Sequence, residues 1–352
     1  MTDIQTMPIA SNESAQSISF WRAALKRLMA SRLAQICMVI LSIYFLLAAA
    51  CATGLLASDW NTEVGVSFAN PSFAPNIDNP QGKNSLVSDE KIEIDEKTRA
   101  VDPLAYKYDE INQRAAQYEQ KATELKWVLP LGGDKWGRSI LTKVIKGGEV
   151  SMSVGLAAAL LAVFVGTVLG AFGGYFGGRI GDLLEWVYNV FTAMPYILLV
   201  IAFATVLGKG VSTVIIVLGF TGWTGVYRLI RSEYIKQRGR DYIQAANAIG
   251  ASDFRMMFGH ILPNVSHLIL VQLSQLVVDF IKSEVILSFL GFGVPTDSVS
   301  WGIMINEVVP EMVLGKWWQL LAVAVVMSTF VVAFGLFTDL LRDALDPKAS
   351  RR

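Results

Sequence analysis

Three ionisable side chains interrupt an otherwise apolar stretch: Asp279, Lys282 and Glu284. Charged groups are costly inside a bilayer, so they usually pair with one another or face a cavity. Asp279 and Lys282 are three residues apart and can pair on one helix face. Such pairing is favoured over direct contact with a substrate. Glu284 has no evident helical partner and is the better candidate for a functional group, and all three are candidates for a transport pathway.

Patterns for catalysis, metal binding or nucleotide binding are missing from the sequence. Its only histidines, His260 and His267, are seven residues apart, and Cys37 and Cys51 lie on one apolar helix, about 21 Å apart at 1.5 Å per residue. Neither pair is completed into a metal site, and the cysteines are too distant for a disulfide. The phosphate-binding pattern Gly-x-x-x-x-Gly-Lys-Ser/Thr does not occur. We expect no enzyme activity and no cofactor bound by this chain.

The composition indicates a membrane protein. Of 352 residues, 53% are hydrophobic and 17% charged, and the mean hydropathy is +0.44, whereas soluble domains are about 25% charged. The formal net charge is +0, and the basic residues form no stripe that could follow a nucleic acid. Lipid is therefore an expected partner and nucleic acid is not.

Apolar segments of sufficient length predict an all-α polytopic membrane protein with six transmembrane helices. The predicted spans are residues 33–57, 150–174, 183–207, 211–231, 264–290 and 317–341. The first is expected to be a retained helix and not a cleaved signal peptide, because its apolar run is too long. Within the second, Gly166 and Gly170 form a Gly-x-x-x-Gly pair that favours ordinary helix packing.

The predicted organisation has a tail at 1–32, a first helix at 33–57, an insertion at 58–149, a five-helix core at 150–341 and a tail at 342–352. The insertion contains no span. Four of its residues at helical spacing predict one short helix: Ile111, Ala115, Tyr118 and Ala122. It carries no catalytic constellation, so a solvated lid or spacer is favoured over a catalytic domain.

Basic residues near the helix ends predict the orientation. If the N-terminus is inside, the inner segments hold most of the arginines and lysines, whereas the short outer loops hold only Lys209 and Lys316. The positive-inside rule then places both termini and the 234–264 loop in the cytoplasm and the insertion outside. Trp301, Trp317 and Trp318 are expected in an outer interfacial belt.

The loop from Tyr234 to Asn264 is a polar, basic island between two apolar segments. Asp241 to Ile249 is predicted to be a short helix, because Asp241 can cap its start and Gly250 favours a left-handed stop. Pro263 is expected to mark the start of the next element. A water-exposed helix between two spans is either a connector or a surface for a soluble partner.

The spacing of Gln244-Ala245-Ala246, Gly250 and Leu262-Pro263 resembles the coupling-loop signature of ABC importer permeases. Gln244 and His260 depart from the usual Glu and Ile. Two other stretches, Leu131 to Leu141 and Leu287 to Pro295, are similar to segments of the dipeptide and oligopeptide permease subfamily. The resemblance covers residues 130–348 well and the first helix loosely.

This resemblance implies a bacterial inner-membrane subunit of a peptide importer that forms half of a translocation pathway. The implied partners are a second homologous permease in a heterodimer, two cytoplasmic ATPase subunits that use ATP, and an extracytoplasmic solute-binding protein. Coupling to the ATPases would involve Gln244, Ala245, Ala246, Gly250, Leu262 and Pro263. Two alternatives stay open: a permease for nickel chelates, glutathione or opines, and an ion-coupled secondary transporter, for which the halves show no convincing repeat.

Overall fold

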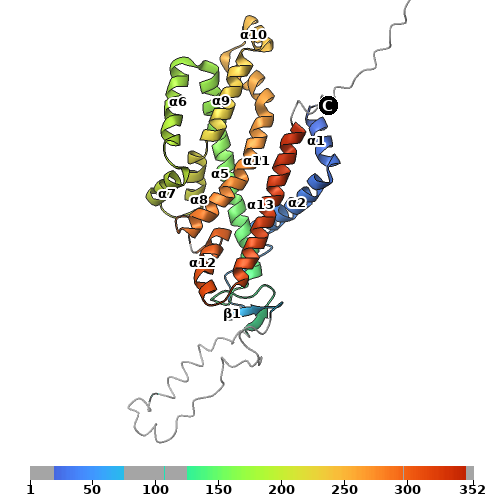
Figure 1. Cartoon of the computed structure of the whole chain (residues 1–352), viewed down its shortest axis with the longest axis vertical. Helices are drawn as coiled ribbons and strands as arrows, with labels where there is room; N and C mark the ends of the chain where they lie inside the picture. The colour runs from blue at the N-terminus through green and yellow to red at the C-terminus, as the bar shows by residue number, and fades with distance from the viewer. Residues whose placement is uncertain (1–19, 75–106, 108–124, 296, 346–352) are drawn as a thin grey trace, which may run out of the picture.

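The computed structural model describes residues 20–74, 107, 125–295 and 297–345, and it is a bundle of helices with a small strand pair at one end and α10 at the other (Figure 1). The elements are α1 (Phe20–Ala30), α2 (Arg32–Ala52), β1 (Gly65–Pro71), β2 (Lys126–Leu129), α5 (Ile140–Phe176), α6 (Gly178–Thr192), α7 (Tyr196–Leu207), α8 (Val211–Thr221), α9 (Thr224–Arg238), α10 (Asp241–Ala248), the π-helix η2 (Arg255–Ile261), α11 (Leu262–Phe289), α12 (Trp301–Val313) and α13 (Trp318–Leu345).

The predicted all-α membrane fold is confirmed. Within the described residues, five helical stretches are long and apolar enough to cross a membrane: Arg32–Ala52, Ile140–Phe176, Val211–Arg238, Arg255–Phe289 and Trp318–Leu345. A sixth span is present if α6 and α7 are counted together. These two helices meet at an angle of 89°, so the single straight helix predicted at 183–207 is wrong. Pro195 explains the break, because proline lacks an N–H and disfavours helix in the residue before it.

The helix α5 begins at Ile140, ten residues before the predicted start at 150. Its first turns carry Lys143, Lys146 and Glu149, which made them look like loop by hydropathy. Before α5, β1 and β2 pair in parallel, a strand pair that the sequence did not predict. The tail 1–19 and the short helix predicted around Ile111 to Ala122 lie outside the described residues.

Close packing of α5 against α9 depends on glycines in α5. A Cβ added at Gly166 would lie 2.6 Å from the Cβ of Val226, and one at Gly170 would lie 2.9 Å from the carbonyl oxygen of Tyr227. Both distances are shorter than a side chain tolerates, so only glycine permits this approach. The predicted packing role of the Gly-x-x-x-Gly pair is confirmed.

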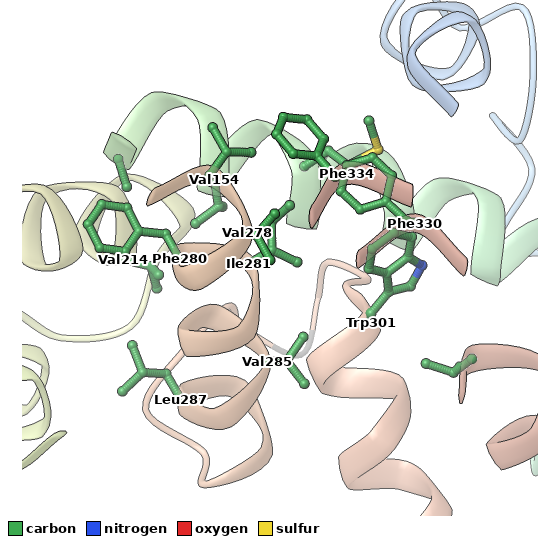
Figure 2. Close-up of a cluster of buried hydrophobic side chains, with 14 of the residues drawn as sticks. Val154, Val214, Val278, Phe280, Ile281, Val285, Leu287, Trp301, Phe330 and Phe334 are labelled. Carbon is green, nitrogen blue, oxygen red and sulfur yellow. The ribbon is translucent and has the colours of Figure 1, made fainter. Parts of the chain in front are cut away.

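The main core lies between α5, α8, α11, α12 and α13, and Figure 2 shows Trp301, Phe330 and Ile281 within it. The prediction of an interfacial tryptophan belt is wrong for two of its three members. Trp301 and Trp318 are 0% and 1% exposed, and Trp317 is 38% exposed. The indole N–H of Trp301 donates to the carbonyl of Val144 (3.0 Å), and that of Trp318 donates to the carbonyl of Gly133 (3.1 Å). A protein acceptor replaces the water that an interfacial indole would use.

Candidate functional site

The loop between α9 and α11 folds largely as predicted. The helix α10 runs from Asp241 to Ala248, and Gly250 follows it with φ +82°, the left-handed stop. One detail is wrong. Arg240, and not Asp241, occupies the cap position, and no side chain caps the helix there. Pro263 marks the start of α11, as predicted: the helix begins at Leu262, and Pro263 lies in its first turn, where a missing N–H costs nothing.

The two alanines of the signature differ in burial. Ala246 and Ile243 are buried against the chain itself, whereas Ala245 and Gln244 are exposed. Of the remaining signature residues, Gly250 and Pro263 are exposed and Leu262 is half-buried. Only part of the signature can therefore contact another molecule, and Ala246 holds α10 in place.

A buried tyrosine in α9 helps to fix the position of α10. Tyr234, in α9, is fully buried, and its hydroxyl donates to the carbonyl oxygen of Met257 in η2 at 3.1 Å. Tyr234, Ile243 and Met257 belong to one hydrophobic cluster, to which the end of α5 also contributes. The helix α10 thus rests on a packed base and presents its outer face in a fixed orientation.

Two large apolar side chains are exposed beside Gly250. Ile249 is 86% exposed and Phe254 is 71% exposed. Together with Gln244, Ala245 and Gly250 they form what we call the docking surface. Next to it is a cavity of about 260 Å³ lined by Tyr175, Phe176, Arg238, Ile243, Gln244, Asn247, Asp253 and Met256. An apolar patch on a polar loop is typical of a protein interaction site.

The α11 helix carries a polar stripe. Asp279 and Lys282 form the predicted pair, with Oδ1 and Nζ 2.9 Å apart and side chains 59% and 46% exposed. One and two turns earlier, the amide of Gln272 donates to Gln275 at 3.0 Å. The spacing of these four residues, the α11 stripe, places them on one side of the helix. A charged pair exposed on an apolar span must face a partner subunit or an aqueous path.

Glu284 lies away from this stripe and is completely buried. It accepts hydrogen bonds from the hydroxyls of Ser288, one turn later, and Ser151, in α5, both at 2.7 Å. The expectation that it has no helical partner is therefore wrong. Ser151 in turn accepts the backbone N–H of Trp301 at 3.2 Å, so the carboxylate ties α5, α11 and the start of α12 together. Its role in a pathway stays a prediction.

An ion cluster of Asp134, Arg138, Lys143 and Glu307 lies at the opposite end of the bundle. Lys143 Nζ is 2.8 Å from Asp134 Oδ2 and 2.6 Å from Glu307 Oε2, and Arg138 Nε is 2.7 Å from Asp134 Oδ2. Burial alone would raise the pKa of Asp134, but Lys143 and Arg138 outweigh it and hold that pKa below its usual value.

No pattern in the sequence predicted this ion cluster. Its members come from the loop before α5, the first turn of α5 and the middle of α12, so no local pattern joins them. One residue could have indicated it: Lys143 stands at the start of a long apolar run. Ionisable groups in such segments usually pair with another charge, and this argument was made for Asp279 but not for Lys143. Among the described residues, no group of three or more His, Cys, Asp or Glu side chains is arranged to hold a metal ion, and this includes the two histidines.

A family model described as "Binding-protein-dependent transport system inner membrane component" matches residues 166–351, more than half of the chain. The chain belongs to this family. It is therefore a multi-pass inner-membrane subunit of a transport system that depends on a binding protein. The matched region includes α9, α10, η2 and α11, so the docking surface and the α11 stripe both lie within it.

Several curated proteins are similar over most of the helical region. The dipeptide transport system permease protein DppC of Bacillus subtilis is 37% identical over 220 residues, which cover 62% of this chain and 69% of that protein. The oligopeptide transport system permease protein OppC of Salmonella typhimurium is 37% identical over 217 residues, covering 62% and 72%. The glutathione transport system permease protein GsiD of Salmonella paratyphi A is 39% identical over 217 residues, covering 62% and 71%.

Among solved structures, an inward-facing form of the MetNI methionine ABC transporter matches with a TM-score of 0.43 at 15% identity. The match covers 60% of this chain and 97% of that one.

Proposed function

We propose that this chain is a permease subunit of an ATP-driven peptide importer, and that it contacts a cytoplasmic ATPase through the docking surface. The observation that carries the proposal is the exposure of Ile249 and Phe254 on a loop whose base is fixed by Tyr234. Large apolar side chains that protrude from a rigid support are typical anchors of a protein interface. The names of the dipeptide and oligopeptide relatives support peptide as the cargo.

The orientation of the chain in the membrane is inferred from the basic residues at the α10 end. Basic residues are concentrated around α9 and α10, among them Arg228, Lys236, Arg238 and Arg240, which supports a cytoplasmic location for that end. Both termini are then cytoplasmic, and the strand pair and the ion cluster are extracytoplasmic. An external solute-binding protein would deliver cargo to that second end.

The α11 stripe supports a second permease subunit. Asp279 and Lys282 are exposed in the single chain although they lie in a span, and lipid contact would be costly for both. A homologous subunit facing the stripe would enclose it within a shared pathway, of which this chain forms half. ATP hydrolysis belongs to two partner ATPase chains, since the sequence here lacks a phosphate-binding loop.

Glutathione is the second candidate cargo, because a relative named as a glutathione permease is 39% identical to this chain. Glutathione is itself a small peptide-like solute, so the two cargoes need the same kind of polar pathway. Competition uptake in membrane vesicles, with labelled dipeptide against unlabelled glutathione, separates them. Dipeptide uptake that persists in excess glutathione supports the peptide system.

The docking surface is tested by co-purification of the chain with the ATPase subunits encoded beside its gene. Ala245→Glu places a charge on the exposed face of α10 and is expected to abolish recovery of the ATPase while the chain stays folded. Ala246→Glu, one residue later, is buried and is expected to lower the unfolding temperature of the chain itself. Ser58→Glu, at an exposed residue in the turn between α2 and β1, is the control and leaves recovery unchanged.

Unchanged ATPase recovery with Ala245→Glu would contradict the docking surface. Failure of the wild-type chain to recover any ATPase, under conditions that preserve complexes, would contradict the whole importer proposal. In that case uptake driven by an ion gradient in proteoliposomes tests the secondary-transporter alternative.

A further inference from the structure

A buried carboxylate next to the ion cluster has no role in that cluster's ion pairs. Glu311 lies in the last turns of α12, four residues after Glu307, and is 2% exposed. Its Oε1 atom makes no hydrogen bond within the described part of the chain. A buried acceptor without a donor is unfavourable, and a buried unpaired charge is more so.

A second buried acceptor at the ion cluster is also unsatisfied. Gln319, in the first turn of α13, is 0% exposed, and its amide nitrogen donates to the Met304 carbonyl at 3.1 Å and to Glu307 Oε2 at 3.2 Å. Its Oε1 atom has no donor among the described residues. Two buried acceptor oxygens, of Glu311 and Gln319, thus lie next to Glu307 without a donor among the described residues.

The charges around Glu311 do not balance when it is ionised. The groups that face it are Glu307 from its own helix, Lys143 from α5, and Asp134 and Lys135 from the loop before α5. Lys143 is already held by Asp134 and Glu307, and Arg138 is paired with the same two carboxylates.

The remaining nearby cations are directed elsewhere. Lys135 Nζ lies 3.8 Å from the centre of the Trp136 ring, and Lys316, in the turn after α12, lies over the rings of Phe68 and Trp318. Three carboxylates, the buried Asp134 and Glu311 and the half-buried Glu307, thus face two buried cations, Lys143 and Arg138. One proton on Glu311 would balance the charge and supply a donor.

We propose that Glu311 is a proton-binding site whose protonated carboxyl holds the last turns of α12 against the ion cluster and the start of α13. A metal ion is a poorer occupant, because Lys143 and Arg138 already occupy the neighbouring carboxylate oxygens. Burial, and secondarily Glu307, raise the pKa of Glu311 to about 7, so the site would change its protonation near neutral pH. In the proposed orientation, Glu311 lies at the extracytoplasmic end, so its protonation follows the pH on that side of the membrane.

Infrared difference spectroscopy of the purified full-length chain tests protonation directly. Between about pH 5 and about pH 9, which brackets the raised pKa, the wild-type chain is expected to lose a carboxylic acid C=O band with a midpoint near pH 7. Glu311→Gln, which keeps the shape and cannot ionise, removes this change. Glu63→Gln, at an exposed carboxylate near the same end, keeps it. Glu284→Gln excludes the buried carboxyl of α11 as its source, and the ion pairs of Asp134 keep that carboxyl ionised.

A C=O band change that persists in Glu311→Gln would overturn the proposal, and so would a wild-type spectrum without such a change. Hydrogen exchange of the wild-type chain supplies a readout that needs no variant. After correction for intrinsic rates, amides of residues 305–314 are expected to exchange several-fold faster above pH 7 than below it. Equal protection at both pH values would exclude the proposed hold on α12. Neither measurement depends on cargo or ATPase.

Discussion

The two ends of the bundle are built in opposite ways. At the α10 end, apolar side chains such as Ile249 and Phe254 are exposed while charged groups lie at the surface. At the β1–β2 end, charged groups such as Asp134 and Lys143 are buried and joined to one another. Figure 1 shows how far apart these ends are, with α5 leading from one toward the other.

The two ends differ in whether their side chains are satisfied within the chain. A buried ion network is satisfied within the chain, and removing one member leaves the others uncompensated. An exposed apolar patch on a polar loop is incomplete until something covers it. The β1–β2 end is therefore built for internal rigidity, and the α10 end is built for contact with another protein. Substitutions at the two ends should affect different quantities.

The largest effect is expected at Lys143. Lys143→Met keeps most of the side-chain volume but leaves Asp134 and Glu307 with only one of their two shared cations, Arg138. We expect a loss of about 3 to 5 kcal/mol in the free energy of unfolding. Thermal unfolding of the detergent-solubilised chain measures it. The exposed Lys135→Met is the control. A loss below about 1 kcal/mol would mean that the ion cluster contributes no more than an ordinary surface ion pair.

An intermediate effect is expected at the docking surface, on binding only. Ile249→Ser and Phe254→Ser should each weaken ATPase affinity by roughly tenfold or more, since each removes a large apolar anchor. Their effect on the free energy of unfolding should stay within about 0.5 kcal/mol, because both side chains are exposed. Titration with purified ATPase gives the affinity. If these variants bound the ATPase normally but had a lower free energy of unfolding, the α10 end would serve internal stability, and the proposed contrast between the two ends would be wrong.

The smallest effect is expected for an ion pair at the α10 end. Lys236 Nζ lies 2.6 Å from Glu233 Oε1, as short as the contacts of Lys143, but the lysine side chain is 64% exposed. Lys236→Met should change the free energy of unfolding by less than about 0.5 kcal/mol, because solvent screens the pair. The same unfolding assay compares it with Lys143→Met. Equal effects would show that burial does not decide the weight of these pairs.

Local sequence patterns were sufficient where a single segment decides the structure. Five of the six spans, the α10 helix with its stop at Gly250, and the Asp279–Lys282 pair follow from hydropathy, turn chemistry and helical spacing. The Gly166 and Gly170 spacing also indicated a close helix contact, although not that α9 would be the partner. Each of these features depends on residues within a few turns of one another.

Tertiary structure alone decided which side chains face inward. Ala245 and Ala246 are equivalent in the signature, yet only the packing of α10 on Tyr234 and η2 buries the second. The sequence predicted a membrane-interface position for Trp301, but in the folded chain its indole N–H donates to the carbonyl of Val144.

The ion cluster and the position of Glu311 beside it join residues from α5, α12 and the loop before α5, far apart in sequence. Burial and charge pairing between distant segments depend on the assembled fold, and periodicity within one segment cannot specify them.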